Sequence, residues 1–287
     1  MRVQNSFRKV RTAARRALGR AAVLSVLPWG GGSVGHAQSQ AVEVRYSAPQ
    51  LNCAQFLETT ESDIQTETSG RIREQTAGRR GVWQFRATPA VDGVSLEGWL
   101  DSLSLWRKSQ ETTIRPDTDG LLGGRYRGVL SGSGTYLSQA RPFVPDEVAE
   151  VAGMGTALDD FFPPLPPRLL RPGQAWSDSA GVTLRRMADS GMSGIPLYRF
   201  DLEVRRETRS NPIPRDTASL PLRQVSQEHG TFVWHPLLGL LRRDRRIVVE
   251  TSVPAGRTIR QPVRSRVEQR ITVRRDLTVL PEHNGHC

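Results

Sequence analysis

The sequence holds few residues with the spacing that metal binding needs. His283, His286 and Cys287 carry donor atoms for a soft metal, but they lie on a terminal tail, and chain ends are usually poorly ordered. Asp117 and Asp119 resemble the start of a calcium loop, yet apolar residues and a glycine follow where oxygen ligands should continue. Carboxylates beside a glycine are common in turns, so we predict a hairpin turn there and no metal site.

Catalytic motifs are also missing. The sequence contains no HExxH metalloprotease pair, no GxSxG nucleophile elbow and no glycine-rich phosphate loop. His229 and His235 flank a predicted strand, and no pair of carboxylates stands in an apolar setting that would favour acid–base chemistry. We predict no catalytic residue and no cofactor. A hydrolase with dispersed residues stays an alternative, because catalytic groups need not be adjacent in sequence.

Tryptophans are the first group of residues that favours a function. Beyond residue 37 they all lie in predicted strands, at Trp83, Trp99, Trp106, Trp176 and Trp234. Aromatic rings that line a curved sheet form a floor for a lipid or another apolar ligand, and we assign this role to Trp83, Trp99 and Trp234. The alternative is ordinary core packing, because large aromatic side chains dominate protein cores.

Arginines form the second group. Four arginines are separated by an even number of residues, two or four, and therefore share one face of a strand. They are Arg264, Arg266, Arg270 and Arg274. Such a face attracts the phosphates of an envelope polyanion. The alternative is a solvated outer face whose arginines pair with acidic residues of another strand, for which the candidates are Glu58, Glu61, Asp63 and Glu67.

Cys53 and Cys287 are the only cysteines of the chain and lie far apart in the sequence. In an oxidising compartment two thiols usually pair, so we predict a structural disulfide between them. The alternative is a free thiol on the C-terminal tail. A redox-catalytic pair is not expected, because the sequence has no CxxC motif.

The elements that must position these residues are mainly strands. Apolar and polar residues alternate in segments 42–46, 83–87, 198–205 and 263–274, so each segment buries one face and exposes the other. Burial on one side only favours an antiparallel sheet. Further strands are predicted at 56–67, 70–76, 93–106, 125–138, 175–187, 222–235 and 239–253.

One segment has the pattern of a helix. Pro145 suits the first helical position, acidic residues follow it, and apolar residues then recur at helical spacing, which predicts a helix over 145–161. The proline-rich stretch 161–168 must be extended, and it is either a stiff connector or a ligand for a polyproline-binding domain. Helix and connector, 143–173, separate two sheet sections, 41–142 and 174–280, whose joining into one sheet the patterns leave open.

The first 37 residues have the pattern of a secretory signal. Seven basic residues precede a short apolar run at 21–27, and small residues ending at Ala37 suit signal peptidase. We predict cleavage near Ala37 and a periplasmic or secreted protein, exported by the general secretory route or, given Arg15 and Arg16, by the twin-arginine route. The alternative is a basic N-terminal helix of a cytosolic protein.

The signal also explains most of the positive charge. The chain carries 40 basic and 29 acidic residues, and removing the seven basic residues of the signal leaves 33 against 29, a net charge of +4. We therefore expect no nucleic-acid partner, since such partners need clustered basic residues. Residues 38–287 are long enough for one β-rich domain, and they hold no apolar run that would cross a membrane as a helix.

Two short motifs resemble those of uncharacterised exported bacterial proteins. Residues 169–177 contain a Pro-Gly-x-x-Trp entry to a strand, and residues 119–126 are similar to a second motif, a hairpin, of that group. The resemblance implies no known activity and no catalytic residues. By analogy, the predicted fold resembles periplasmic lipoprotein-carrier half-barrels, in which helix partly covers a curved antiparallel sheet.

These patterns predict a mainly β protein with a curved antiparallel sheet or half-barrel and one covering helix near 145–161. We expect a non-enzymatic envelope protein that holds an apolar or amphiphilic ligand in the concave sheet. The alternative is a structural or interaction protein that binds an anionic polymer or a protein partner through the arginine face. The oligomeric state does not follow from these patterns.

Overall fold

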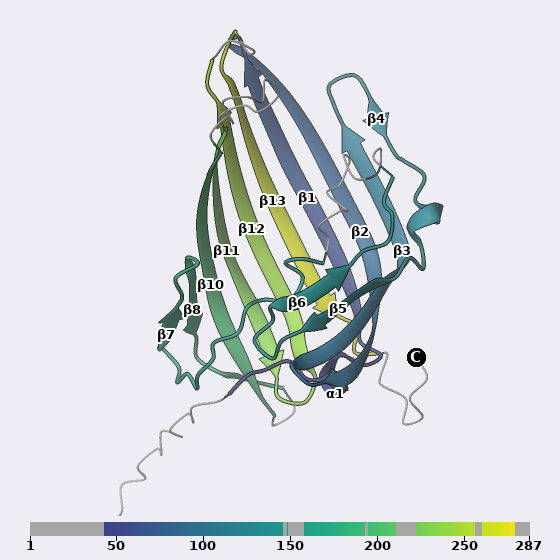
Figure 1. Cartoon of the computed structure of the whole chain (residues 1–287), viewed down its shortest axis with the longest axis vertical. Helices are drawn as coiled ribbons and strands as arrows, with labels where there is room; N and C mark the ends of the chain where they lie inside the picture. Colours follow the sequence, from purple (N-terminus) through teal and green to yellow (C-terminus); the bar gives the residue numbers. More distant parts are fainter. Residues whose placement is uncertain are drawn as a thin grey trace, which may run out of the picture. The chain divides into compact units, whose positions relative to one another are not determined.

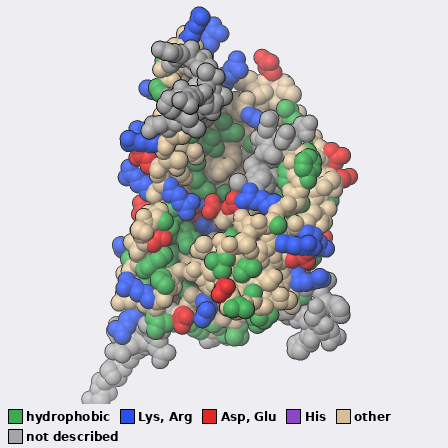
Figure 2. All heavy atoms as spheres, viewed as in Figure 1, with side chains coloured by type: hydrophobic (Ala, Val, Ile, Leu, Met, Phe, Trp, Pro, Cys, Tyr) green, Lys and Arg blue, Asp and Glu red, His purple; other side chains and the backbone are tan. Residues whose placement is uncertain are grey.

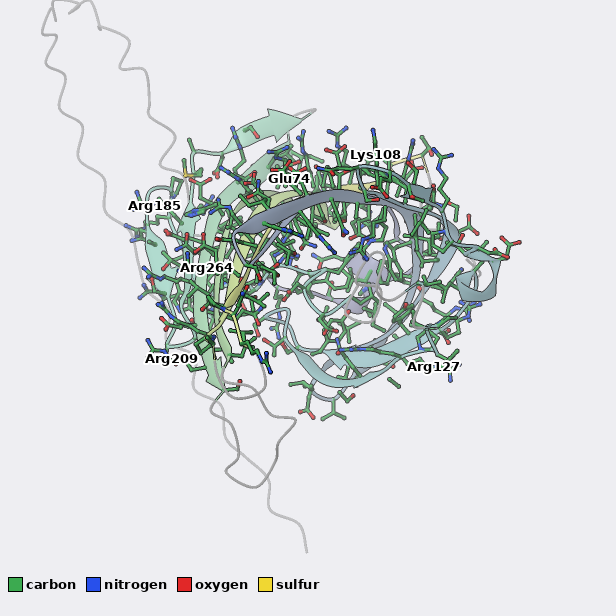
Figure 3. The ribbon with its side chains drawn as sticks, turned by 90° about the horizontal axis from the view of Figure 1, so that it is seen from above. Glu74, Lys108, Arg127, Arg185, Arg209 and Arg264 are labelled. Carbon is green, nitrogen blue, oxygen red and sulfur yellow. The ribbon has the colours of Figure 1, made fainter. Side chains whose placement is uncertain are left out.

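A computed structural model describes residues 43–145, 148, 158–192, 195–210, 222–255 and 260–278. These residues all belong to one structural unit, Ser39–Cys287. Nearly all of their regular structure is β-strand, and the strands bend into one strongly curved sheet (Figure 1). In the view from above, the sheet wraps around its own interior (Figure 3).

Seven long strands make most of the sheet. They are β1 (Gln55–Thr68), β2 (Arg71–Ala90), β3 (Gly93–Lys108), β10 (Ile195–Ser210), β11 (Leu222–His235), β12 (Gly239–Val253) and β13 (Val263–Arg275). The short strands are β4 (Thr113–Ile114), β5 (Tyr126–Leu130), β6 (Tyr136–Ala140), β7 (Ala175–Ser177), β8 (Val182–Arg186) and β9 (Ser190–Met192). Two short helical turns, α1 (Ala48–Leu51) and η1 (Asp119–Leu121), complete the described elements.

The strand order is β6-β5-β3-β2-β1-β13-β12-β11-β10-β8-β7, with β4 beside β3 and β9 beside β10. Every pairing is antiparallel, and the sheet ends at β6 and β7 without closing. The long pairing of β1 with β13 joins the two predicted sheet sections into one sheet. The predicted class, a curved antiparallel sheet, is thereby confirmed.

Period-two alternation sorts the side chains onto two faces. We call the face that carries Phe56, Trp83 and Val273 the concave face, because these residues are buried inside the curve, and the opposite face the outer face. Since successive side chains point to opposite sides, the register assigns every other residue of the long strands to one of the two faces.

An aromatic core fills the lower half of the concave face. Phe56, Phe85 and Trp83 meet Phe161 and Phe162 with ring centroids 5.3 to 6.5 Å apart, mostly edge to face. The sheet contributes the first three residues, and an irregular segment that crosses the face contributes the other two. This geometry is the one that aromatic pairs prefer, and it leaves the lower half solid.

The predicted first strand, 42–46, is wrong for the residues that the structure describes, because residues 43–47 pair with no strand ladder. Val44 and Tyr46 are nevertheless buried. The Tyr46 hydroxyl donates a 2.9 Å hydrogen bond to the carbonyl oxygen of Pro163. The same alternation thus also suits an extended segment that crosses the core.

Most of the predicted helix at 145–161 lies outside the described residues. Its last residues, 158–161, form turns. In the proline-rich stretch that follows, Phe161, Phe162 and Leu165 are buried in the core. This burial favours the connector interpretation over an accessible ligand for a polyproline-binding domain.

Several predicted strand boundaries change in the structure. Segments 70–76 and 83–87 form a single strand, β2, whereas 125–138 and 175–187 each divide into two strands. Gly134 and Gly181, with φ of +85° and +83°, make the turns that divide them, and a Cβ on Gly181 would lie 2.2 Å from the Arg205 carbonyl oxygen. Residues 119–121 form η1 rather than a hairpin turn, and the Asp117 carboxylate accepts the Asp119 amide at 2.9 Å.

Candidate ligand-binding face

The three tryptophans assigned to a ligand floor do not share a site. Trp83 and Trp234 are 0% and 1% exposed, and both lie within the packed core. Trp234 packs edge to face on Tyr46, with centroids 5.1 Å apart. Trp99 lies on the outer face, where the Arg125 guanidinium stacks 3.8 Å above its ring. These positions favour the alternative of core packing.

A polar belt crosses the concave face directly above the aromatic core. Its first cluster is centred on Glu58, which is 2% exposed. The Glu58 carboxylate accepts hydrogen bonds from the Arg79 guanidinium and, at 2.8 Å, from Trp83 Nε1. A buried charge needs such partners, so this cluster satisfies a carboxylate that would otherwise be costly inside the sheet.

The second cluster of the belt is centred on Glu228. Arg243 Nη2 donates to its carboxylate at 2.9 Å, and Arg245 donates through Nε and Nη2 at 2.7 and 2.8 Å. Burial alone would raise the pKa of Glu228, but the hydrogen bonds and charges of the two arginines outweigh it and hold the pKa below its ordinary value. Burial likewise lowers the pKa of Arg243 to about 10.

The same two arginines fasten the segment that covers the core. Arg243 donates to the carbonyl oxygens of Asp160 and Phe161, and Arg245 donates to that of Asp160 at 3.0 Å. The belt therefore connects strands β11 and β12 to the covering segment. It also ends the aromatic core, because its arginines and glutamates pair with one another and with carbonyl oxygens of the cover.

The sequence pattern grouped Glu58 with the outward acidic residues of its strand, and that prediction is wrong. Glu58 stands two residues from Phe56 and shares its concave face, whereas Glu61, Asp63 and Glu67 face outward. The parity relative to Phe56 was the available signal. The sequence also did not show which arginines of β12 belong to the belt. Four of the five residues 242–246 are arginines, and alternation divides them between the two faces.

Above the belt the concave face is lined by small aliphatic and hydroxyl side chains. The register aligns Ile64, Val267 and Val249 in one row across β1, β13 and β12, and aligns Thr66, Ser265 and Thr251 in the next. All six are half-buried. We call them the upper concave floor. Figure 2 shows the molecule hollowed in this upper part, with hydrophobic side chains at the back of the hollow.

The predicted arginine row lies on the outer face and is partly paired. Arg266 Nη1 lies 2.7 Å from the Glu250 carboxylate, and Arg270 Nη2 lies 3.1 Å from that of Glu268. The register also sets Glu61 opposite Arg270 and Glu67 opposite Arg264. Arg264 and Arg274 make no ion pair within the described chain. This arrangement matches the alternative of an arginine face paired with acidic neighbours.

Among the described residues, neither histidine forms a hydrogen-bonded pair with a carboxylate. His229 lines an outer-face groove of about 740 Å³ and stands opposite Glu203, but no hydrogen bond joins it to any described residue. The ring of His235 is buried, and its Nδ1 accepts the amides of Leu237 and Leu238 at 3.1 Å. His235 therefore stabilises the turn between β11 and β12.

The predictions about cysteine, metal and membrane depend partly on residues outside the described ranges. Cys53 is buried, and no described cysteine is free, but Cys287 lies outside these ranges, as do His283 and His286. The described residues contain no cluster of three or more metal-ligating side chains. They also contain no helix long and apolar enough to span a membrane.

Known proteins show only a weak similarity to this chain. The sequence matches no protein-family model and no curated protein. Among solved structures, the chain is similar to a DUF1329 family protein from Desulfovibrio piger, with 9% identity over 83% of this chain and 91% of that chain. The TM-score is 0.18, so the two backbones do not superpose as a whole. The fold described above rests on its own sheet topology.

Proposed function

We propose that this protein is an exported binding protein that holds an apolar or amphiphilic ligand on the upper concave floor. The observation that carries the proposal is the contrast between the two halves of the concave face. Aromatic rings fill the lower half, whereas half-buried valine, isoleucine, threonine and serine side chains line the hollow above the belt. A concave, mostly apolar surface with a few polar groups is the usual form of a small-molecule site.

The size of the floor suits a long, thin ligand. From Ser62 to Thr68 the strand rises six residues, which at about 3.3 Å per residue spans roughly 20 Å. Each methylene buried on such a floor contributes about 0.8 kcal/mol. An extended acyl chain that lies along the strands would therefore gain affinity from its whole length, while the belt limits how deep it can reach.

The outer arginine face is not part of the proposed binding site. Two of its four arginines already pair with glutamates, and the opposed acidic residues of β1 reduce the attraction for an anionic polymer. We propose no catalytic role for the groove around His229, because among the described residues His229 forms no hydrogen bond with a carboxylate.

A charge on the floor is expected to weaken binding. Val249→Asp places a carboxylate among apolar side chains, so the affinity for the fluorescent apolar probe N-phenyl-1-naphthylamine should fall about tenfold or more. The matched control is Val248→Asp, since Val248 is also half-buried but lies on the outer face of the same strand. Probe titrations of both variants, with thermal melting to verify folding, measure the effect.

Equal probe affinity in the two valine variants would contradict the proposed site. Val267→Asp, on the neighbouring strand, repeats the test at the partner of Val249 in the same row. If Val249→Asp does not fold, this second variant decides the result.

Export and the disulfide form the second part of the proposal. Intact mass spectrometry of protein purified from the periplasm should give a chain that begins at Gln38 and has lost two hydrogens, as a Cys53–Cys287 bond requires. Under native conditions the same measurement should detect retained lipid. A full-length chain that starts at Met1, recovered from the cytosol, would rule out export.

A further inference from the structure

Above the belt, the two faces of the sheet differ in the charged residues that they carry. On the concave side of β1, β2 and β10 to β13, the described residues in this region include arginines but no acidic residue. The arginines are Arg71 and Arg73, which oppose Thr68 and Thr66 of the floor strand β1, and Arg206, which opposes Ser226. Among the described residues of these strands, the charge on this part of the concave side is therefore positive.

The outer side of the same strands carries a balanced mixture. Its acidic residues are Glu61, Asp63, Glu67, Glu74, Glu207, Glu250 and Glu268, and they alternate with Arg205, Arg209, Arg223, Arg246, Arg264, Arg266 and Arg270. Figure 3 shows Glu74, Lys108 and Arg185 on the outside of the curved sheet. The unbalanced charge of the concave side is thus a property of that face and not of the whole molecule.

The concave arginines also lack the partners that other arginines have. Within the described chain Arg71, Arg73 and Arg206 make no ion pair or side-chain hydrogen bond. By contrast, Arg243 and Arg245 of the belt share the Glu228 carboxylate. Three guanidinium groups on the concave side of their strands, with five donors each, are therefore available for a ligand.

Their positions suit one end of an amphiphile. Arg71 and Arg73 lie on β2 and Arg206 lies on β10, so they flank the strands of the upper concave floor from both sides. All three are exposed, which places the charge where an ionic head group would still contact water. Guanidinium groups bind carboxylate and phosphate oxygens in pairs, whereas a zwitterionic head group offers no net negative charge.

From this distribution we infer that the ligand is an anionic amphiphile, a lipid whose carboxylate or phosphate head group is held by Arg71, Arg73 and Arg206 while its acyl chain lies on the floor. The inference rests on the proposed function and specifies its ligand class. Charge complementarity selects the head group, and the aliphatic rows select the chain.

The test compares two lipids that differ only in head-group charge. Lysophosphatidylglycerol is anionic and lysophosphatidylcholine is zwitterionic, and both are used with the same acyl chain to displace N-phenyl-1-naphthylamine from the full mature protein. We expect the anionic lipid to bind about tenfold more tightly. Arg71→Glu/Arg73→Glu and Arg206→Glu should remove this preference while leaving the affinity for the neutral probe unchanged.

Matched controls stand on the same strands. Arg80 and Arg86 are exposed arginines on the outer face of β2, and Arg205 is one on the outer face of β10, so Arg80→Glu/Arg86→Glu and Arg205→Glu match the charge changes of the two concave variants without touching the hollow. These controls should keep the preference for the anionic lipid. If they lose it as fully as the concave variants, the preference comes from overall charge and the inference is wrong.

Other outcomes separate the inference from the proposed function. Equal affinity for the two lipids would show that the ligand need not be anionic. The proposed binding site on the upper concave floor would still be supported if Val249→Asp loses probe binding and Val248→Asp keeps it. Displacement of the probe by glycerol phosphate alone would identify a small anion as the ligand and would overturn the amphiphile. If Val249→Asp and Val248→Asp bind the probe equally well, the upper concave floor is not the binding site.

Discussion

Replacing Glu228 with glutamine is expected to lower the free energy of unfolding by about 3–5 kcal/mol. The substitution keeps the shape of the side chain but removes the charge that Arg243 and Arg245 share. Both guanidinium groups are almost fully buried and would then remain as uncompensated charges. Their hydrogen bonds to the covering segment at Asp160 would not replace the lost charge.

Urea denaturation followed by tryptophan fluorescence measures this loss. The control is Glu207→Gln, because Glu207 accepts hydrogen bonds from Arg209 and Arg223 at the exposed end of β10. Exposed ion pairs contribute little to stability, so this variant should unfold at the wild-type urea concentration. A Glu228→Gln protein as stable as the control would show that the charged belt does not stabilise the fold.

The same carboxylate makes stability depend on acid. The pKa of Glu228 in the folded protein lies below its ordinary value of 4.5, so folding favours the ionised form. Its contribution is complete above the ordinary pKa and is lost as the pH falls through the lower folded value. The difference in stability between wild type and Glu228→Gln should therefore be largest near neutral pH and shrink below about pH 4.5.

Trp83→Ala is expected to cost about 3–5 kcal/mol, the range for large aromatic residues truncated in a core. The ring is 0% exposed and packs against Phe85, Tyr126 and Phe161, so the deletion leaves a cavity that its aromatic neighbours cannot easily fill. The lost indole also leaves Glu58 with one partner fewer. Thermal melting and urea denaturation both measure the effect.

Two further variants separate the causes. Trp83→Phe keeps most of the packing and removes the 2.8 Å hydrogen bond to Glu58, so it should cost about 1–3 kcal/mol. Trp99→Ala, on the half-exposed outer face, should cost clearly less than Trp83→Ala. If Trp83→Ala instead left stability intact and reduced probe binding, Trp83 would be a ligand contact and the core-packing interpretation would be wrong.

Strand positions were largely predictable, because a sheet with one buried face requires apolar and polar residues to alternate along each strand. The predictions for 222–235 and 239–253 coincide with β11 and β12. The strand predicted at 42–46 failed because residues 43–47 cross the core without a ladder partner, and alternation does not reveal whether a partner exists. The sequence predicts two strands, 70–76 and 83–87, in place of the single strand β2, because Gly78 and Gly81 interrupt the apolar pattern.

Candidate site residues were less predictable. The arginine row on β13 followed from its even spacing, but its glutamate partners lie on β12 and on β13 itself. The tryptophans were recognisable as apolar anchors, yet whether such a ring lines a hollow or fills a core depends on what crosses above it. Here Phe161 and Tyr46, both from irregular segments, occupy that space.

The sequence by itself determined which side chains share a face of each strand, because alternation is a local property of extended backbone. It therefore already contained an outward arginine row and an amphipathic sheet. Only the tertiary structure decided which strands are neighbours, that β1 pairs with β13, and that segment 158–162 packs over the lower half of the concave face. Those choices depend on contacts between residues far apart in the chain, and they place the aliphatic floor and the arginines of β2 and β10 on one concave face.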